Sequence, residues 1–467
     1  MGEINAMCGK KYHVTVDGVP AKLEEIRVSA HPFNRTWPGK QRDASQSEVA
    51  YMLRLFGDKP VEISIYTGEP VKEAVVRPLS KGVIPNASGN TVVFVLKENG
   101  KYSAEINGSH FAIHIFYVKE EHYETHDTPT YHFGPGRHNV GLLRLYDRES
   151  VYIHKNAVVH GSISAVEASN NKICGQGILD AGWEQRTEKN GDIGWDGENY
   201  FEPGLVHTYG GIRMFRCKNV QVQGITVTDP ASYAISFWGT DTIRIDSVNV
   251  VGLWKYNTDG IDFVNSRNIQ VRDCFVRSFD DSMCLKGITA FSDMSVENVH
   301  ISGCVFWCDW GKNIEIGLAS ACKEISNVVW EDCDIIHGNG TCITISNGQW
   351  ADIHDIAYRN IRVEYAFGTE PMVLQKTDEQ VYQTDGTTAV PALIFITDRR
   401  RNWQGNVSYD DPRTKIQNIT LENIQVFMDE RIQKVPEMII RKMTESSIFE
   451  NIYVGKVFIN GIETKLY

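Results

Sequence analysis

The sequence predicts an all-β protein in which a small antiparallel β-sandwich precedes a right-handed parallel β-helix. Three observations lead to this fold class. A degenerate repeat of 22–30 residues runs through the middle of the chain. Each copy alternates apolar and polar residues like a short strand, and the first ~120 residues alternate in the same way without that period.

Residues 1–120 are expected to form the sandwich. Strand-like alternation is clear in Val61–Tyr66, Thr91–Leu96 and Phe111–Phe116. Turn sequences that contain Gly and Asn, such as Ser88–Asn90 and Glu98–Gly100, separate these segments. Short strands joined by tight turns are typical of antiparallel sheets packed face to face.

Residues 121–467 are expected to form the β-helix, with the polar segment Glu120–Thr130 as a linker and coiling from Tyr131 onward. Successive copies of the repeat start 22, 27, 30, 29 and 28 residues apart, then 63 residues apart where an insertion intervenes. The copies are Asn219–Val227, Asp241–Asn249, Asn268–Val276, Asn298–Phe306, Asn327–Ile335, Asp355–Val363 and Asn418–Val426. Because no helical pattern separates them, they are expected to stack as coils of a solenoid.

Two positions of the repeat are expected to be structural. The leading Asn and Asp residues are expected to cap turns. Cys274, Cys304 and Cys333 occupy one repeat position and should form an interior column of thiols. Ten cysteines in 467 residues do not resemble a disulfide scaffold, and Cys304 and Cys308 lack a second pair at zinc-site spacing. We therefore expect no metal site.

Composition excludes several classes of function. With 47 basic and 59 acidic residues the net charge is −12, which argues against nucleic-acid binding. No apolar run is long enough to cross a bilayer, and Met1–Val14 has no apolar signal core, so a soluble chain without membrane association is expected. The compartment stays open: export if a leader was removed, the cytoplasm otherwise. No nucleotide-binding or nucleophile-elbow motif is present, so no cofactor is expected, and the sequence carries no signal for oligomeric state.

Catalytic candidates come from a second strand that follows the first in five successive coils. Equivalent positions on adjacent coils lie ~4.8 Å apart, one strand spacing. Aligning these second strands gives a single column, which contains Tyr233, Asp259, Asp281, Lys312 and Thr341. Asp280 directly precedes Asp281, so three carboxyl groups should converge within two coils.

Three crowded carboxyl groups indicate acid–base chemistry. They cannot all ionise freely, so at least one should keep its proton to higher pH. One protonated and one ionised carboxyl, with room for a water between them, is what inverting glycoside hydrolysis requires. Turn capping is the alternative role for a single Asp, but an Asp-Asp pair stacked over a third Asp is costly without a function.

At these residues the sequence resembles a known group of enzymes. Asn257–Asp262 (NTDGID) and Asp280–Lys286 (DDSMCLK) are similar to the paired signatures of the polygalacturonase family of inverting glycoside hydrolases, which have the pectin-lyase-like β-helix fold. The related dextranase and isopullulanase family carries a similar pair and places a β-sandwich before the β-helix. The resemblance covers residues 131–365. It implies that Asp280 is the general acid and that Asp259 and Asp281 hold and deprotonate the attacking water.

The chain departs from polygalacturonases on the next two coils. Those enzymes carry Gly-His-Gly and Arg-x-Lys there, whereas this chain has Trp310–Gly317 and Cys342–Ser346. Thr344 and Ser346 replace the cations that would bind a uronate carboxylate, and Glu315 would repel one. A neutral poly- or oligosaccharide is therefore the favoured substrate, as for dextranases.

A uronate substrate stays open because two lysines lie near the acids. Lys286 and Lys312 could each bind a substrate carboxylate, or pair with Asp281, Asp262 or Glu315 instead. Other candidate substrate contacts are Asp262 and Glu315, which share an outward column with Thr344, and the aromatic residues Trp254 and Trp310 at strand ends.

Two further alternatives remain at this stage. A lyase of this fold would use Ca²⁺, for which the Asp set is a conceivable site. A non-catalytic carbohydrate-binding solenoid would use the groove for recognition alone. The segment Trp183–Tyr200, rich in Gly, Asp and Trp, is either a wall at one end of a groove or an ordinary surface loop.

Overall fold

The computed structural model describes residues 12–30, 44–121, 129–184, 210–371, 387–398 and 414–465. Its helical elements within these ranges are the short 3-10 helices η1 (Ala44–Gln46), η2 (Leu79–Lys81) and η4 (Thr289–Phe291). None of the described helices is long and apolar enough to span a membrane. The chain forms two compact units, residues 1–30 with 47–122 and residues 31–46 with 123–467. The predicted all-β class is confirmed.

The first unit is a β-sandwich of two five-stranded sheets. One sheet has the order β2 (Val19–Ala21), β1 (His13–Val16), β5 (Val61–Tyr66), β8 (Thr91–Leu96), β7 (Asn86–Ser88). The other has the order β3 (Glu24–Ser29), β4 (Ser47–Phe56), β10 (Ile113–Val118), β9 (Gly100–Ile106), β6 (Ala74–Arg77). Buried residues of both sheets, among them Ile63, Phe94 and Ile115, form one apolar core.

The sandwich differs from the prediction in one pairing. β4 and β10 run parallel, with Tyr51 opposite Ile113, whereas the other pairings in the two sheets are antiparallel. Parallel neighbours need a long connection, and here five strands lie between β4 and β10 in the chain. The sheet is therefore mixed rather than purely antiparallel.

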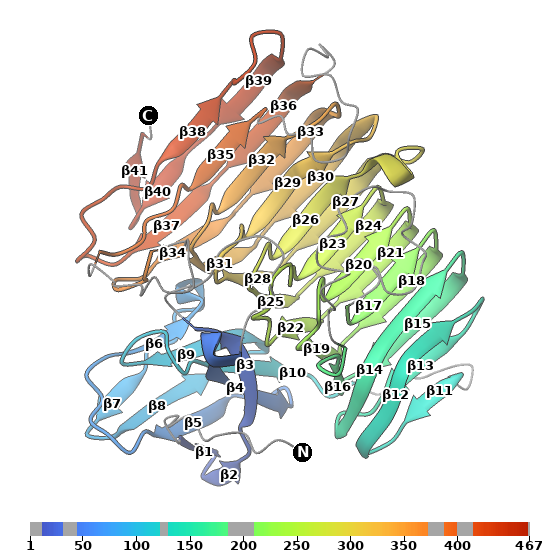
Figure 1. Cartoon of the computed structure of the whole chain (residues 1–467). Helices are drawn as coiled ribbons and strands as arrows, with labels where there is room; N and C mark the ends of the chain where they lie inside the picture. The colour runs from blue at the N-terminus through green and yellow to red at the C-terminus, as the bar shows by residue number, and fades with distance from the viewer. Residues whose placement is uncertain are drawn as a thin grey trace. The chain divides into compact units, whose positions relative to one another are not determined.

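The second unit is a parallel β-helix with three strands in each coil, so the prediction of this fold is confirmed (Figure 1). The first face consists of β11 (Tyr131–Phe133), β13 (Ser150–Ile153), β15 (Ser169–Gly175), β18 (Lys218–Gln223), β21 (Asp241–Asp246), β24 (Arg267–Arg272), β27 (Val296–Ser302), β30 (Glu324–Glu331), β33 (Asp352–Arg359), β36 (Lys415–Glu422) and β39 (Ile448–Val454).

Two further series of strands complete the coils. The long strands β12 (Gly136–Leu145) and β14 (Ala157–Val166) begin both series. One continues through β16 (Ile178–Asp180), β19 (Thr226–Thr228), β22 (Asn249–Val251), β25 (Phe275–Ser278), β28 (Val305–Cys308), β31 (Asp334–Gly338), β34 (Arg362–Tyr365), β37 (Ile424–Met428) and β40 (Val457–Ile459). β41 (Ile462–Thr464) then pairs antiparallel with β40. The other continues through β17 (Ile212–Phe215), β20 (Ile235–Trp238), β23 (Ile261–Val264), β26 (Met283–Gly287), β29 (Ile314–Ser320), β32 (Ile343–Asn347), β35 (Ile394–Thr397) and β38 (Met438–Arg441).

Stacked identical positions hold the coils together. Cys274, Cys304 and Cys333 are buried free thiols, and each Sγ donates to the carbonyl two residues earlier, at 3.2, 3.3 and 3.3 Å. Burial raises the pKa of Cys304 well above its ordinary value, so this thiol stays protonated. The predicted interior column of thiols is confirmed.

The leading Asn residues form a ladder along the turns. Asn298 donates through Nδ2 to Oδ1 of Asn268 at 3.0 Å, and Asn327 donates to Asn298 at 2.9 Å. All three have φ near +57°, a left-handed conformation that Asn tolerates better than most residues. The repeat therefore selects Asn both for its backbone conformation and for the amide ladder, as the turn-capping prediction required.

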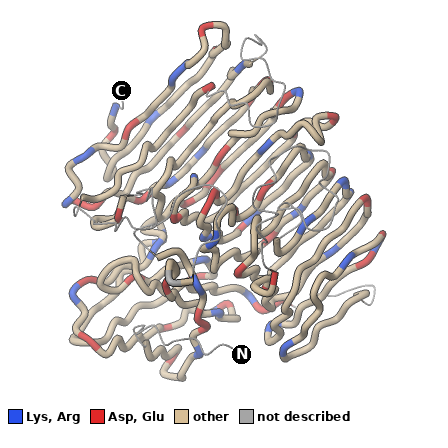
Figure 2. Tube along the Cα trace, in the orientation of Figure 1, with Lys and Arg blue, Asp and Glu red and all other residues tan. Residues whose placement is uncertain are grey.

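Charged positions of both signs occur along the coils (Figure 2). Some of them pair across neighbouring coils in strict register. Arg267 lies opposite Asp241 with an N–O distance of 2.8 Å, and Arg362 lies opposite Asp334 with a distance of 2.6 Å. Opposite charges directly across two strands stabilise the pairing modestly.

Candidate active site

Asp259 and Asp281 occupy equivalent turns on adjacent coils. The amide of Gly260 donates to the carbonyl of Asp281 at 2.9 Å, and the amide of Ser282 donates to the carbonyl of Lys312 at 2.8 Å. Two residues further on, Ile261, Met283 and Ile314 pair in register as β23, β26 and β29. The predicted stacking of residues 259, 281 and 312 is therefore present.

Two glycines allow the turns to approach so closely. A Cβ atom on Gly311 would lie 2.5 Å from the amide nitrogen of Asp281, and one on Gly260 would lie 2.3 Å from the carbonyl oxygen of Ser282. Any larger residue would push the coils apart. These glycines thus bring the acids of neighbouring coils together.

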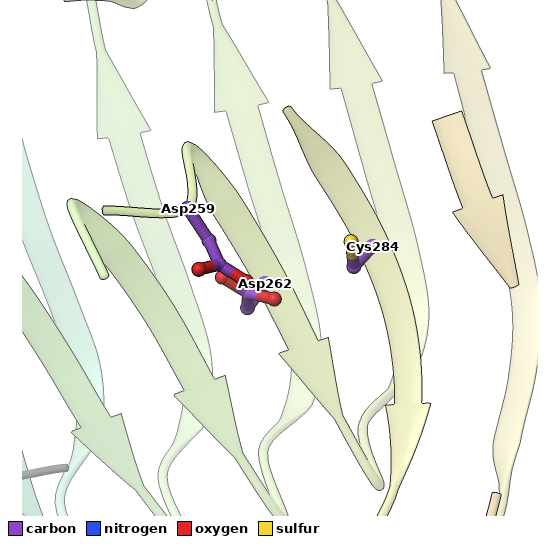
Figure 3. A group of neighbouring side chains, drawn as sticks. All are labelled: Asp259, Asp262 and Cys284. Atoms are coloured by element: carbon purple, nitrogen blue, oxygen red, sulfur yellow. The ribbon is translucent and has the colours of Figure 1, made fainter. Parts of the chain in front are cut away.

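A buried lysine holds the acids on the first of these coils. The carboxyl groups of Asp259, in the turn before β23, and Asp262, on β23, point toward one another, with Cys284 on the adjacent strand β26 (Figure 3). Nζ of Lys286 lies 2.6 Å from Oδ2 of Asp259, 2.7 Å from Oδ1 of Asp262 and 3.9 Å from Oδ2 of Asp281. All these side chains are nearly inaccessible to solvent. One ammonium group therefore lies within ion-pair distance of three carboxyl groups.

Burial and charge set the protonation of this group. Burial raises the pKa of Asp259 to about 6, although Lys286 opposes the rise. Burial also raises the pKa of Asp262 well above its ordinary value. Burial alone would lower the pKa of Lys286, but the facing charges of Asp259 and Asp262 raise it well above its usual range. Lys286 therefore remains a cation.

Asp280 and Asp281 are pushed to opposite protonation states. Burial, followed by the negative charges of Asp259 and Asp281, raises the pKa of Asp280 well above its ordinary value. Burial also disfavours the charge of Asp281, but Lys312 and Lys286 outweigh it and hold the pKa of Asp281 well below its usual range. The backbone amide of Lys312 donates to Oδ1 of Asp281 at 2.9 Å, and Nζ of Lys312 lies 3.4 Å from the same atom. An acid and a base thus lie side by side in the sequence.

Glu315 supplies a second protonated carboxyl. It lies on β29, fully buried, with Oε2 at 3.1 Å from Nζ of Lys312 and a hydrogen bond to Asp281. Burial and then the charge of Asp281 raise the pKa of Glu315 to about 8. Glu315 therefore keeps its proton at neutral pH and donates it in a hydrogen bond to ionised Asp281.

Sequence reasoning missed Cys284 as a member of the cluster and gave Tyr233 no role in it. Cys284 lies between Asp262 and Glu315 in the outward column, in register with both, and its Sγ is 4.0 Å from Oε2 of Glu315. The alignment of the second strands already places Cys284 in this column, so the sequence contained the signal needed to find it. Tyr233 was placed in the column without a role, and its ring lies beneath Lys286, with Nζ 4.8 Å from the ring centroid.

The acids do not fit the calcium site considered for a lyase. Ligand atoms of Asp259, Asp262 and Cys284, and of Asp281, Cys284 and Glu315, lie within 4.8 Å of one another. Ca²⁺ prefers six to eight oxygen ligands, whereas each set includes a thiol whose pKa is raised by burial. The lysine ammonium groups, Lys286 in the first set and Lys312 in the second, already supply the compensating positive charge.

The two predicted aromatic platforms differ in environment. Trp310 is half-buried at the turn after β28 and stacks on Phe279, with centroids 5.3 Å apart and planes 10° apart. Trp254 is only 6% exposed, and its indole N–H donates to Oδ1 of Asp229 at 2.9 Å. Trp254 therefore packs into the fold, and the interpretation of this residue as a sugar-stacking platform is not supported. Of the segment Trp183–Tyr200, only Trp183 and Glu184 are described, and the remainder lies outside the described residues.

Comparison with known proteins identifies the family. The sequence profile of glycosyl hydrolases family 28 matches residues 149–398, more than half of the chain. The chain belongs to glycosyl hydrolases family 28. This match includes all the acids described above, and family membership confirms the predicted resemblance to glycoside hydrolases.

Individual relatives of this family 28 chain are distant. It is 28% identical over 152 residues to an Arabidopsis thaliana protein named "Probable polygalacturonase", a match covering 32% of this chain and 31% of that one. The chain thus spans about a third of the length of this relative. Its structure resembles Dex49A from Penicillium minioluteum with a TM-score of 0.54, 15% identity, and coverage of 96% of this chain and 83% of that one. A family 28 exopolygalacturonase from Yersinia enterocolitica matches with a TM-score of 0.46, 12% identity, and coverage of 86% and 97%. At such identities the resemblance to Dex49A shows the fold alone.

Proposed function

We propose that this family 28 chain hydrolyses O-glycosidic bonds of a neutral poly- or oligosaccharide by single displacement, with inversion at the anomeric carbon. One observation carries the proposal. Asp280 and Asp281 are adjacent, yet their surroundings raise the pKa of Asp280 and lower that of Asp281, and Asp259 stacks beside them on the adjacent coil. A carboxylic acid and a carboxylate with distinct environments are the two groups that such a reaction requires.

Each acid has a defined part in this reaction. Protonated Asp280 donates its proton to the glycosidic oxygen as the bond from that oxygen to the anomeric carbon breaks. Asp281 and Asp259 orient a water molecule on the opposite face of the sugar, and one of them takes a proton from this water as its oxygen bonds to the anomeric carbon. Exchange with solvent then returns both acids to their starting states.

The lysines support the reaction electrostatically. Lys312 keeps Asp281 ionised through contacts at 2.9 Å and 3.4 Å, and Lys286 limits the pKa rise of Asp259. Without these cations, burial would leave both carboxyl groups protonated and unable to accept a proton. Lys286 and Lys312 therefore act on the enzyme's own acids.

The same contacts favour a neutral sugar. Lys286 lies near three carboxyl groups and Lys312 near two, so each positive charge is already balanced within the protein. Thr344, in register with Glu315, makes a hydrogen bond with Thr341 and supplies no cation. A uronate placed here would face several acidic groups without a compensating charge of its own.

A uronate polysaccharide is the second candidate, favoured by the name of the Arabidopsis relative. The experiment that separates the two is a glycan panel containing dextran, pullulan and polygalacturonate, with release of reducing ends as the readout. We expect release from a neutral glycan, no release from polygalacturonate, and no effect of a metal chelator. Preference for polygalacturonate would overturn the neutral assignment. An unsaturated product or loss of activity with EDTA would indicate a lyase, and binding without any release would indicate a carbohydrate-binding solenoid.

A further inference from the structure

Trp183 is an exposed aromatic residue in line with the acid cluster. It lies in the turn after β16 and is 59% exposed. Successive register pairs connect this turn to that of Asp280: Leu179 with Val227, Val227 with Val250, and Val250 with Val276. Because adjacent coils are ~4.8 Å apart, Trp183 lies about 14 Å from the Asp280 coil along the same edge of the solenoid.

One face of the Trp183 ring is covered by a buried histidine. The indole stacks on the ring of His160, a residue of β14, with centroids 4.9 Å apart and planes 7° apart. His160 is only 6% exposed, and its Nδ1 lies 3.2 Å from Oδ2 of Asp180. Since His160 lies on the protein side of the indole, the large exposed fraction of Trp183 belongs to the opposite face and the ring edges.

The chain on both sides of Trp183 is fixed by hydrogen bonds. Before it, the amide of Gly182 donates to Oδ1 of Asp180 at 2.9 Å. After it, Oε1 of Glu184 accepts from the hydroxyl of Ser162 at 2.7 Å and lies 3.1 Å from the guanidinium of Arg213. Oε2 of Glu184 accepts from the amide of Gly210 at 2.9 Å. Partly buried polar contacts thus anchor the chain on both sides of the exposed tryptophan.

An anchored, solvent-facing aromatic ring on the same edge of the solenoid as the acids is suited to stacking against a sugar. The apolar C–H face of a pyranose covers an indole well, and a ring that is already fixed loses little conformational entropy on binding. The charge of Arg213, which is 3% exposed, is balanced by Glu184 at 3.1 Å, so this guanidinium is committed within the protein. The surroundings therefore suit an uncharged sugar better than a uronate.

We propose that Trp183, supported by His160, is a stacking platform for a neutral sugar unit bound three coils away from the catalytic acids. The inference rests on the proposed function, because it takes the substrate to be a glycan lying along the solenoid. Trp183 then contributes to the binding of long glycan chains and takes no part in the chemical step.

Retention in polysaccharide-containing gels tests this platform directly. The full chain carrying Asp280→Asn is compared with the double variants that add Trp183→Ala or Trp183→Phe, in gels that contain dextran, pullulan or polygalacturonate. Tyr453→Ala, which removes another exposed aromatic on a different face, is the matched control. We expect Trp183→Ala to weaken retention by a neutral glycan about tenfold, Trp183→Phe to weaken it less, and the control to have no effect. Equal retention of all variants, retention by polygalacturonate alone, or no retention of the parent would overturn the platform.

A chain-length series separates this inference from the proposed function. In the active enzyme, Trp183→Ala should lower kcat/KM about tenfold for the longest oligosaccharides and leave the shortest cleaved one unchanged. An equal loss at every length would overturn the platform while leaving hydrolysis intact. Trp183-dependent retention in gels, combined with no cleavage of any glycan, would refute hydrolysis while upholding the platform.

Discussion

Nζ of Lys286 lies 2.6 Å from Oδ2 of Asp259, and both side chains are almost wholly buried. This internal ammonium group makes a cluster of acids tolerable inside the solenoid. In the proposed mechanism it also keeps Asp259 available as a carboxylate near neutral pH.

Replacing Lys286 by Met should destabilise the fold. Removing one partner of a buried ion pair costs ~3–5 kcal/mol in the free energy of unfolding. Without the cation, the pKa values of Asp259 and Asp262 would rise further above their unfolded values, so stability should fall as pH rises. Urea unfolding should therefore show a larger loss at about pH 8 than at about pH 5.

The control for this variant is Lys323→Met, at a lysine whose side chain is 82% exposed. Its surface pair with Glu324 is screened by solvent and should contribute little to the free energy of unfolding. A Lys286→Met variant as stable as this control at both pH values would contradict the structural role assigned to Lys286.

Replacing Asp280 by Asn should remove the general acid. We expect kcat to fall about 10²–10⁴-fold, because the leaving oxygen no longer receives a proton, while glycan binding is retained. Asp332→Asn, at an acid that is 58% exposed, should leave turnover unchanged. The distinguishing measurement uses an aryl glycoside whose leaving group needs little protonation. An equally large loss of kcat on that substrate would speak against an acid role.

The acid limb of the pH profile should report Asp259. Its pKa is raised to about 6, and in the proposed reaction its carboxylate form holds the attacking water or accepts a proton from it. The value of kcat/KM should therefore rise with pH through about 6 and fall again at higher pH, when Asp280 loses its proton. A profile that is flat between about pH 5 and pH 7 would show that the ionisation of Asp259 is not required.

Replacing Glu315 by Gln should preserve activity near neutral pH. The amide still donates a hydrogen bond to Asp281, as protonated Glu315 does below its pKa of about 8. Above that pH the native Glu315 gains a negative charge next to Asp281, whereas Gln does not. The ratio of variant to native kcat/KM should therefore change between about pH 7 and pH 9, and a loss of about 100-fold already at pH 6 would mean that Glu315 acts as a carboxylate.

The vertical arrangement of the acids was predictable from the repeat. In a solenoid, an equivalent repeat position is also a neighbouring position in space, so the apolar residues Ile261, Met283 and Ile314 fix where Asp259 and Asp281 must lie. The thiol column and the Asn ladder along the turns were predictable for the same reason.

Other features depend on information that the repeat does not contain. The pairing of Lys286 with Asp259 and Asp262 depends on where its long side chain extends. The burial of Trp254 is accompanied by its hydrogen bond to Asp229 on the adjacent coil. The stacking of Trp183 on His160 joins β14 and β16, where one long strand replaces the regular coil pattern. The parallel β4–β10 pair is a long-range contact that strand alternation alone cannot reveal.

The central claim is that Asp259, Asp280 and Asp281 hydrolyse a neutral glycan by single displacement. Proton NMR of the first products of digestion tests it most directly, since the anomeric configuration is read before mutarotation mixes the two forms. The claim predicts that the newly formed reducing end has the configuration opposite to that of the cleaved bond. A newly formed end with the original configuration, or an unsaturated sugar, would contradict it.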